Sequence, residues 1–290
     1  MESTKVSQDC VRGTKRSWKW RIIRIIILVL LLLFLYWNNN ALSVTQYLYQ
    51  NPEVPQGFEG YRIVHLSDLH NKVFGGENEP LLEQIAALDP DLIVLTGDFV
   101  DASNHTNYDK ARLFMQQISK IAPSYYVLGN HEQLLPEEEM QQFLADVVSY
   151  GVHHVQDEMI TISAENGDSL QLIGLSNRSL YTTKLKTMMA EESKEALYLL
   201  LAHEPQLIDH YAETGVDLVF SGHAHGGQFR IPFVNIGIYA PDQGLFPNLV
   251  EGMHTVQNTT IVVSRGLGNS AFPFRLFNRP EIVCVTLSAG

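Results

Sequence analysis

Residues 221–228 are Ser221-Gly222-His223-Ala224-His225-Gly226-Gly227-Gln228, in which two histidines stand two positions apart between glycines. They follow the apolar run at 216–220, which predicts a buried strand. In a loop just past a strand end, both imidazoles can turn towards one point, while the glycines let the backbone bend sharply and leave room for a ligand. A single His-x-His pair is equally compatible with core packing or a polar surface. The stretch is therefore a candidate metal site that the rest of the chain has to support.

The length and composition fit one globular domain with an N-terminal extension. At 290 residues and 45% hydrophobic content, the chain can bury a sizeable core, and it has no internal repeat. Its two cysteines, Cys10 and Cys284, provide no disulfide framework and no thiolate zinc site. Two cysteines do not indicate in which cellular compartment the protein lies.

The charge is distributed unevenly along the chain. The net charge is −12, but residues 1–24 carry +5, so the remainder carries −17. Such an acidic body repels polyanions at long range, which argues against nucleic acid as a partner. It does not exclude a small phosphate ester held by metal ions, because bound cations reverse the local field.

An apolar segment at 22–37 predicts a transmembrane anchor. Only Arg24 interrupts it, and it ends in Tyr36-Trp37, an aromatic pair suited to a membrane boundary. As a helix it would rise about 24 Å, slightly less than the ~30 Å hydrocarbon core. A cleaved signal peptide is the alternative, although the following residues offer no small-x-small cleavage site, and a buried soluble helix comes third.

The basic residues indicate the orientation of that anchor. Seven Lys/Arg lie within residues 1–24, six of them before the segment and Arg24 near its start, and the next one is Arg62. The positive-inside rule then keeps residues 1–21 as a cytoplasmic tail and places the body outside the membrane. Residues 38–57, with three asparagines and two prolines, are predicted to be a tether, and 58–290 the folded domain.

From residue 58 onward, short apolar runs alternate with helical patterns, which predicts an α/β fold. The predicted helices cover 81–88, 113–121 and 137–150. The predicted strands cover 61–66, 91–96, 125–128, 170–175, 197–202, 218–220, 260–263 and 282–287.

Polar residues recur where these strands end, the edge at which open α/β sheets place their ligands. Each has an ordinary explanation, such as a turn, a cap or a satisfied histidine. Together they favour one metal centre, composed of Asp68, His70, Asp98, Asn130, His131, His203, His223 and His225.

The ordered motifs resemble those of the calcineurin-like metallophosphoesterases. They are Asp68-Leu69-His70, Gly97-Asp98, Gly129-Asn130-His131-Glu132, His203 and Gly222-His223-Ala224-His225. The later stretches 226–230, 263–268 and 274–281 are similar to the membrane-anchored or exported YkuE/YaeI-like branch. The resemblance implies a four-layer α/β/β/α sandwich, preceded here by one transmembrane helix.

The resemblance also implies two divalent metal ions. One would be held by Asp68, His70 and His225 and the other by Asn130, His203 and His223, with Asp98 bridging both. Oxygen donors mixed with imidazoles suit manganese, zinc or iron better than magnesium. Such a pair holds a bridging hydroxide that attacks a phosphoryl group in line.

Further roles are implied around this centre. His131 would act as general acid or hydrogen-bond donor to the leaving oxygen, with Asp68 as its orienting partner, or else be a purely structural histidine. Glu132 is taken as a branch marker with no catalytic role. Substrate phosphate contacts, or equally salt bridges, are predicted for Arg230, Arg265, Arg275 and Arg279.

The predicted activity is hydrolysis of a phosphodiester, with pyrophosphate or monoester as variants. The location outside the membrane suggests a lipid- or wall-linked substrate. Two alternatives stay open: a lipid-precursor pyrophosphatase on the cytoplasmic face, and a non-catalytic surface protein that binds metal.

Overall fold

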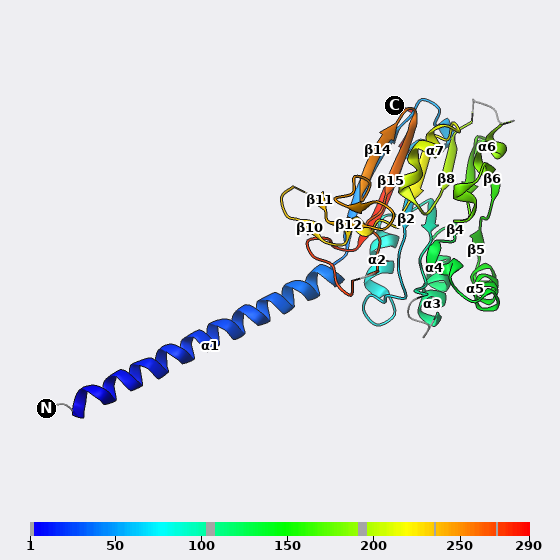
Figure 1. Ribbon diagram of the computed structural model, residues 1–290. Helices are drawn as coiled ribbons and strands as arrows, with labels where there is room; N and C mark the ends of the chain where they lie inside the picture. Colours follow the sequence, from blue (N-terminus) through cyan, green and yellow to red (C-terminus); the bar gives the residue numbers. More distant parts are fainter. Residues whose placement is uncertain (1–2, 103–107, 191–195, 235, 271) are drawn as a thin grey trace.

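The computed structural model describes residues 3–102, 108–190, 196–234, 236–270 and 272–290, with side chains from 18 onward. The long helix α1 (Ser3–Asn40) projects from the body of the protein (Figure 1). Its stretch Trp18–Asn40 has 23 residues and a mean hydropathy of 2.2 over its most apolar window, none of which is buried. This helix is a candidate membrane span, longer than the predicted segment 22–37.

The first sheet contains the N-terminal half of the body and the last strand. Its order is β1-β16-β2-β3-β4-β5, and the neighbours from β2 to β5 are parallel. Because β2, β3 and β4 run the same way, the loops that follow them meet at one edge. The bounds are β1 (Ser43–Gln50), β2 (Arg62–Leu66), β3 (Leu92–Thr96), β4 (Ser124–Val127), β5 (Val152–His154) and β16 (Glu281–Ser288).

The second sheet has the order β14-β15-β9-β8-β7-β6, with β15, β9, β8 and β7 parallel. The loops after β8 and β9 therefore share an edge as well. The bounds are β6 (Glu158–Ser163), β7 (Ser169–Gly174), β8 (Tyr198–Leu201), β9 (Leu218–Ser221), β14 (Gly252–Val256) and β15 (Thr259–Val263). Two small pairs follow β9: β10 (Arg230–Ile231) with β11 (Ile236–Gly237), and β12 (Tyr239–Ala240) with β13 (Gly244–Leu245).

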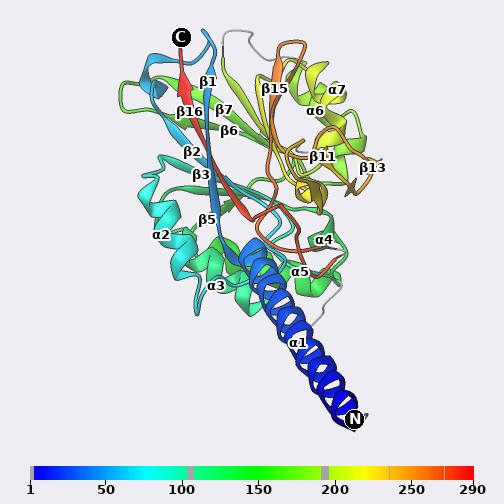
Figure 2. The same cartoon turned by 90° about the vertical axis from the view of Figure 1, so that its left-hand side faces the viewer.

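Three apolar clusters hold the four layers of the protein together. One lies between the two sheets, and one lies on the outer face of each sheet. Between the sheets, Val94 of β3 packs in the same cluster as Leu199 and Phe220 of the second sheet. The alternate residue Leu95 faces the other way, towards α2 (Glu79–Ala87), α3 (Asp109–Ile118) and α5 (Glu137–Ser149). On the outer face of the second sheet, Val219 packs with α6 (Lys184–Met189) and α7 (Ile208–Ala212). The α/β/β/α sandwich is confirmed, and Figure 2 shows the two sheets with their outer helices.

The prediction of a tether at 38–57 is wrong. Asn38–Asn40 continue α1, and Ser43–Gln50 form β1, which pairs in parallel with β16 from Ser43 with Glu281 to Gln50 with Ser288. The folded body therefore begins at β1, with only two residues between it and α1.

Candidate metal centre

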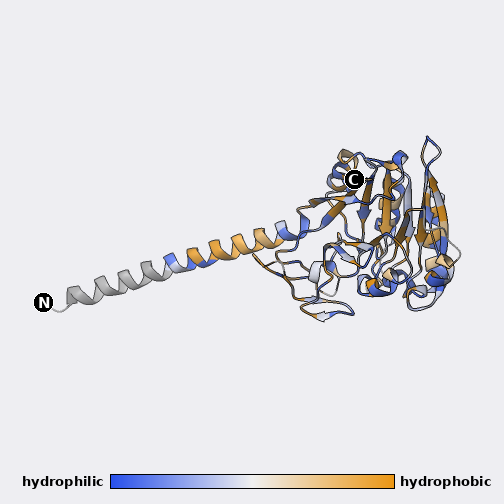
Figure 3. Cartoon of the chain, turned by 90° about the horizontal axis from the view of Figure 1, so that it is seen from above, coloured by the Kyte–Doolittle hydropathy of each residue, from blue (hydrophilic) through white to orange (hydrophobic). Residues whose placement is uncertain are grey.

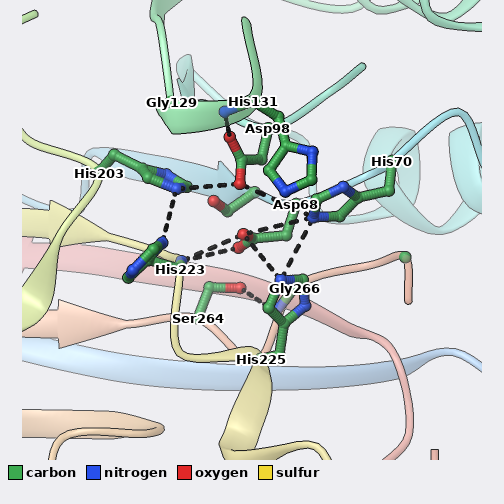
Figure 4. A network of polar contacts seen from close by, with 12 residues as sticks. Asp68, His70, Asp98, Gly129, His131, His203, His223, His225, Ser264 and Gly266 are labelled. Atoms are coloured by element: carbon green, nitrogen blue, oxygen red, sulfur yellow. Dashed lines mark hydrogen bonds and ion pairs between the residues drawn. The ribbon is translucent and has the colours of Figure 1, made fainter. Parts of the chain in front are cut away.

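All eight predicted side chains meet at the edge where the two sheets end. They come from the loops after β2, β3, β4, β8 and β9, and α4 (Asn130–Gln133) follows β4 directly. Both sheets present the carboxyl ends of parallel strands here, so residues far apart in sequence converge. Figure 4 shows His203 and His223 on one side, His70 and His225 on the other, and the carboxylates of Asp68 and Asp98 between them.

The backbone at this edge is held in an unusual conformation. Five site residues have left-handed φ angles between 47° and 65°: Asp68, His70, Asp98, His223 and His225. This conformation costs about 1–2 kcal/mol for a residue with a Cβ. Strain of this kind gathers at functional sites, where the surrounding structure enforces it.

Two glycines make room for the carboxylates. A Cβ on Gly222 would lie 1.9 Å from Ser67 Oγ and 2.4 Å from Asp68 Oδ2, and one on Gly129 would lie 2.2 Å from Asp98 Oδ1. Since real contacts are never so short, a side chain at either position would displace a site carboxylate. The motif glycines thus permit close packing of the loops.

One group of potential ligands consists of Asp68, His70 and His225. Asp68 Oδ1 lies 3.5 Å from His225 Nε2 and 4.0 Å from His70 Nε2, and the two imidazole Nε2 atoms are 3.2 Å apart. The side chains are almost completely buried. The backbone N–H of His223 donates to the Asp68 carboxylate at 3.1 Å and fixes it in place.

A second group consists of Asp98, His203 and His223, with Asn130 beside it. His203 Nε2 lies 3.2 Å from Asp98 Oδ2, 3.2 Å from His223 Nδ1 and 3.1 Å from Asn130 Oδ1. In each of the two groups, the potential ligand atoms of the acidic and histidine side chains lie within 4.8 Å of one another.

Asp98 stands between the two groups. Its Oδ2 atom is 3.2 Å from His203 Nε2 and 3.8 Å from His70 Nε2, while Oδ1 accepts the backbone N–H of His131 at 2.8 Å. Burial opposes ionisation of Asp98, but the positive charge on His203 outweighs it and lowers the pKa of Asp98 well below its usual value. Burial likewise opposes the charge on His203, yet Asp98 and Asp68 raise the pKa of His203 to about 10. A cation entering this site replaces that proton.

The outer nitrogens of two histidines are tied to oxygen atoms. His203 Nδ1 donates to the backbone carbonyl of Thr96 at 2.6 Å, and His223 Nε2 lies 2.8 Å from Asp242 Oδ2. Metal-binding histidines are oriented in this way, because the outer hydrogen bond fixes the tautomer and leaves the inner nitrogen free to bind. Asp242 was not predicted from sequence, because nothing in its local pattern links it to His223.

Glu132, taken from sequence as a branch marker, has a structural function. Its buried carboxylate accepts the backbone N–H groups of Asp98 at 2.9 Å, Phe99 at 2.7 Å and Gly129 at 2.9 Å. It therefore joins the loops after β3 and β4. The signal was present in the sequence, because an acid three residues after a cap position is typical of a helix start.

His131 lies at the rim, with 18% of its side chain exposed. Its Nδ1 atom is 3.3 Å from Asp101 Oδ1 and accepts the backbone N–H of Ala102 at 3.2 Å. Its ring packs edge-on against that of His70, with centroids 4.6 Å apart. The predicted orienting partner, Asp68, is therefore wrong: that carboxylate faces His223, His225 and His70, and Asp101 contacts His131 instead.

Of the four arginines, Arg230 and Arg265 form the salt bridges that the sequence left as an alternative. Both pair with Glu251, and Arg265 also contacts Glu281 at 2.9 Å.

Arg275 has no exposed surface and donates to the backbone carbonyls of Gly268 and Arg265, so its prediction as a substrate ligand is wrong. The guanidinium of Arg279 stands 5.0 Å from the ring centroid of Trp37 in α1.

The donor set fits divalent metal ions. It offers carboxylates, imidazoles and one amide oxygen, all held by buried loops, and it contains no thiolate. Such mixed oxygen and nitrogen sites suit manganese, iron or zinc.

Comparison with known proteins agrees with this chemistry. Residues 61–227, more than half of the chain, match the family model described as calcineurin-like phosphoesterase. The chain belongs to this family. It is 27% identical over 257 residues to the uncharacterized metallophosphoesterase YkuE of Bacillus subtilis, a match that covers 88% of each chain. It is 28% identical to the phosphodiesterase YaeI of Escherichia coli, covering 78% of this chain and 82% of that one.

A more distant relative is the UDP-2,3-diacylglucosamine pyrophosphatase LpxG of Chlamydia muridarum, 22% identical over 84% of this chain and 88% of that one. Family membership and the donor set together establish a metal-dependent phosphoesterase. Its substrate is a phosphoester, and its cofactors are divalent metal ions.

Proposed function

We propose that this protein is a phosphodiesterase with a two-metal centre. The observation that carries the proposal is the position of Asp98, whose Oδ2 atom faces His203 of one ligand group and His70 of the other. A carboxylate placed in this way is suited to share its charge between two cations. Manganese, zinc and iron are the candidates.

The residues divide into two ligand sets around that carboxylate. Asp68, His70 and His225 would hold one ion, and Asn130, His203 and His223 the other. When bound, two such ions supply an activated water and stabilise the phosphoryl oxygens in the transition state. The chain contributes the rigid spacing, through Glu132 and the backbone N–H groups that fix both carboxylates.

His131 is the proposed proton donor to the leaving oxygen. Its Nδ1 atom is engaged by Asp101 Oδ1 at 3.3 Å and the backbone N–H of Ala102 at 3.2 Å, which leaves Nε2 as the nitrogen for the leaving oxygen. One of its nitrogens lies within 4.8 Å of potential ligand atoms of His70 and Asp98, so these three side chains could also hold a metal ion; we assign His131 to proton donation and to neither ligand set.

The substrate is proposed to be linked to a lipid or to the cell wall. The exposed apolar helix α1 supports a single-pass anchor. The seven basic residues within 1–24, before and at the start of the span, support a cytoplasmic N-terminus and a catalytic domain outside the membrane.

The deciding experiment measures metal content and diester hydrolysis on the same samples. Full-length protein is purified in detergent without chelator, analysed for metals, and assayed with bis-p-nitrophenyl phosphate plus Mn²⁺ or Zn²⁺. We expect about two metals per chain, the number that a two-metal site requires.

Asp98→Asn should lower metal content and activity together, since it removes a charge shared by both ions. Asp217→Asn, a buried aspartate away from the site, is the matched control. Full metal content and turnover in Asp98→Asn would refute the proposal.

His131→Ala tests the division of roles. Metal content should stay at the wild-type level, while kcat falls by roughly 10²–10⁴-fold, the range expected for loss of a general acid. Loss of metal in this variant would instead make His131 a ligand. Diesters with better leaving groups should be affected less, because they need less protonation.

A further inference from the structure

One phenylalanine and two arginines of the body contact the C-terminal part of α1. The ring of Phe277 lies 5.2 Å from that of Phe34, and the Arg279 guanidinium lies 5.0 Å from the ring of Trp37. The backbone N–H of Arg275 donates to Asn39 Oδ1 at 2.9 Å. These contacts hold the loop around 272–279 against the last turns of the helix.

Those contacts determine how deep the loop around 272–279 would lie in a bilayer that α1 spans. Phe34 lies inside the apolar segment, six residues before Asn40, which corresponds to about 9 Å along a helix. A bilayer that encloses Phe34 therefore has to accommodate Phe277 at the same level. Trp37 and Arg279 would lie at the boundary between headgroups and hydrocarbon, where aromatic and basic side chains are favoured.

More exposed apolar side chains lie on the small strand pairs. Phe233 is 100% exposed, Leu245 69% and Phe246 60%, although apolar residues of this size are normally covered. Figure 1 shows β10, β11 and β12 on the side of the body from which α1 leaves, and Figure 3 shows orange loop segments beside the last turns of α1. We call this surface the collar; it comprises Phe233, Val234, Leu245, Phe246, Phe272, Phe274 and Phe277.

A wide-open cavity reaches from the end of α1 to His70 at the edge of the metal centre. It measures about 650 Å³ and runs from Leu35 and Tyr36 of α1 to His70 and Asp101 of the site, past Phe274 of the collar. Lys72 is the one Lys or Arg among its described lining residues; its Nζ donates to the carbonyls of Asn39 and Leu267. The lining thus combines apolar side chains (Leu35, Tyr36 and Phe274) with polar ones such as Asn39, Asn40 and Lys72, and His70 is the candidate metal ligand that it reaches.

We infer that the collar sits in the headgroup layer of the bilayer and that this cavity brings the phosphoester of a lipid substrate from the membrane surface to the metal centre. The inference deepens the proposed function and rests on it, since it needs α1 to span the membrane. It selects a lipid over a wall polymer, because the exposed phenylalanines of the collar match acyl chains and not a hydrated polyanion.

The first experiment locates the collar without using activity. Phe246→Cys and Val148→Cys are made in the full-length chain with Cys10→Ser; Cys284 is free but buried. Val148, 55% exposed on α5, is a matched control on the side of the body away from α1. Each variant is labelled with a nitrobenzoxadiazole dye and reconstituted into phosphatidylcholine–phosphatidylglycerol vesicles with or without doxyl-labelled lipid. We expect at least threefold stronger quenching at 246 than at 148. Equal quenching at the two positions would overturn the docking surface.

The second experiment tests the lipid substrate with two esters of identical reacting chemistry. Hexadecyl p-nitrophenyl phosphate partitions into vesicles, whereas methyl p-nitrophenyl phosphate stays in water. Reconstituted wild-type protein should have a kcat/KM at least tenfold higher for the hexadecyl ester. Equal values with strong quenching would refute the lipid route and favour a wall polymer.

These measurements distinguish failure of the proposed phosphodiesterase activity from failure of the membrane docking surface. If neither ester nor bis-p-nitrophenyl phosphate is hydrolysed, the proposed function fails, while the quenching still decides the docking surface. If alkaline carbonate extracts the protein from vesicles, the anchor fails and the inference falls with it.

Discussion

A single buried carboxylate, that of Glu132, couples the two loops that carry Asp98 and Asn130. Its oxygens accept backbone N–H groups from both loops, so Glu132→Gln places an amide NH₂ against N–H donors that lose their acceptor. An unsatisfied buried donor costs about 1–3 kcal/mol. We expect a melting temperature several degrees lower and weaker metal retention during dialysis against a mild chelator.

Glu138→Gln on the exposed face of α5 provides the control for this substitution. It should leave melting and metal retention unchanged. If Glu132→Gln behaved like this control, the carboxylate would have no organising role.

The potential ligands could be predicted from sequence because each is a metal-binding residue type that directly follows an apolar strand. Asp101 and Asp242 could not, because their significance depends on which histidine they face in space. The arginines were predicted on charge alone, and burial decides the outcome for Arg275, whose guanidinium is satisfied by backbone carbonyls.

At the scale of elements, the strands and helices with clear periodicity were predicted to within a few residues. β3, for example, was expected at 91–96 and is found at Leu92–Thr96. β1 was not predicted because it is an edge strand with one mostly exposed face. Its apolar residues alternate with polar ones, so the strand has no apolar run. Among the described residues, its one strand partner is the distant β16, which no local pattern reveals.

Asp217, just before β9, makes stability depend on pH. Burial, followed by the neighbouring Glu53, raises the pKa of Asp217 to about 7, although the Tyr198 N–H that it accepts acts in the opposite direction. In the unfolded chain this carboxyl ionises near pH 4, so folding takes up a proton between about pH 4 and 7. The loss of folding stability that the raised pKa of Asp217 causes grows as the pH rises through that window, and it is constant at higher pH.

Asp217→Asn removes this proton uptake and keeps an acceptor for Tyr198. Relative to wild type, the variant should be unchanged near pH 4 and more stable by about 1–2 kcal/mol at pH 8. Thermal melts at both pH values measure the difference. A stability gain of the same size at both would assign the effect to packing and not to ionisation.

At the scale of the whole molecule, α1 and the body form one unit with strongly opposed charge. The tail before the span is basic, the body carries −17, and the contacts from Phe34 to Asn39 join the helix directly to the body. Such an asymmetry supports the proposed orientation, because basic segments stay on the cytoplasmic side of a membrane. The metal centre would then face the outside, within reach of the membrane surface through the cavity beside α1.

This orientation can be measured with the chain's own cysteine pattern. Cys10 lies in the tail, Cys284 is buried, and Val148→Cys adds a reporter on the body. In intact Escherichia coli spheroplasts, a membrane-impermeant maleimide should label Val148→Cys and spare Cys10, which should react only after lysis. The reverse pattern would place the catalytic domain in the cytoplasm, where the proposed lipid substrate would have to be drawn from the inner leaflet.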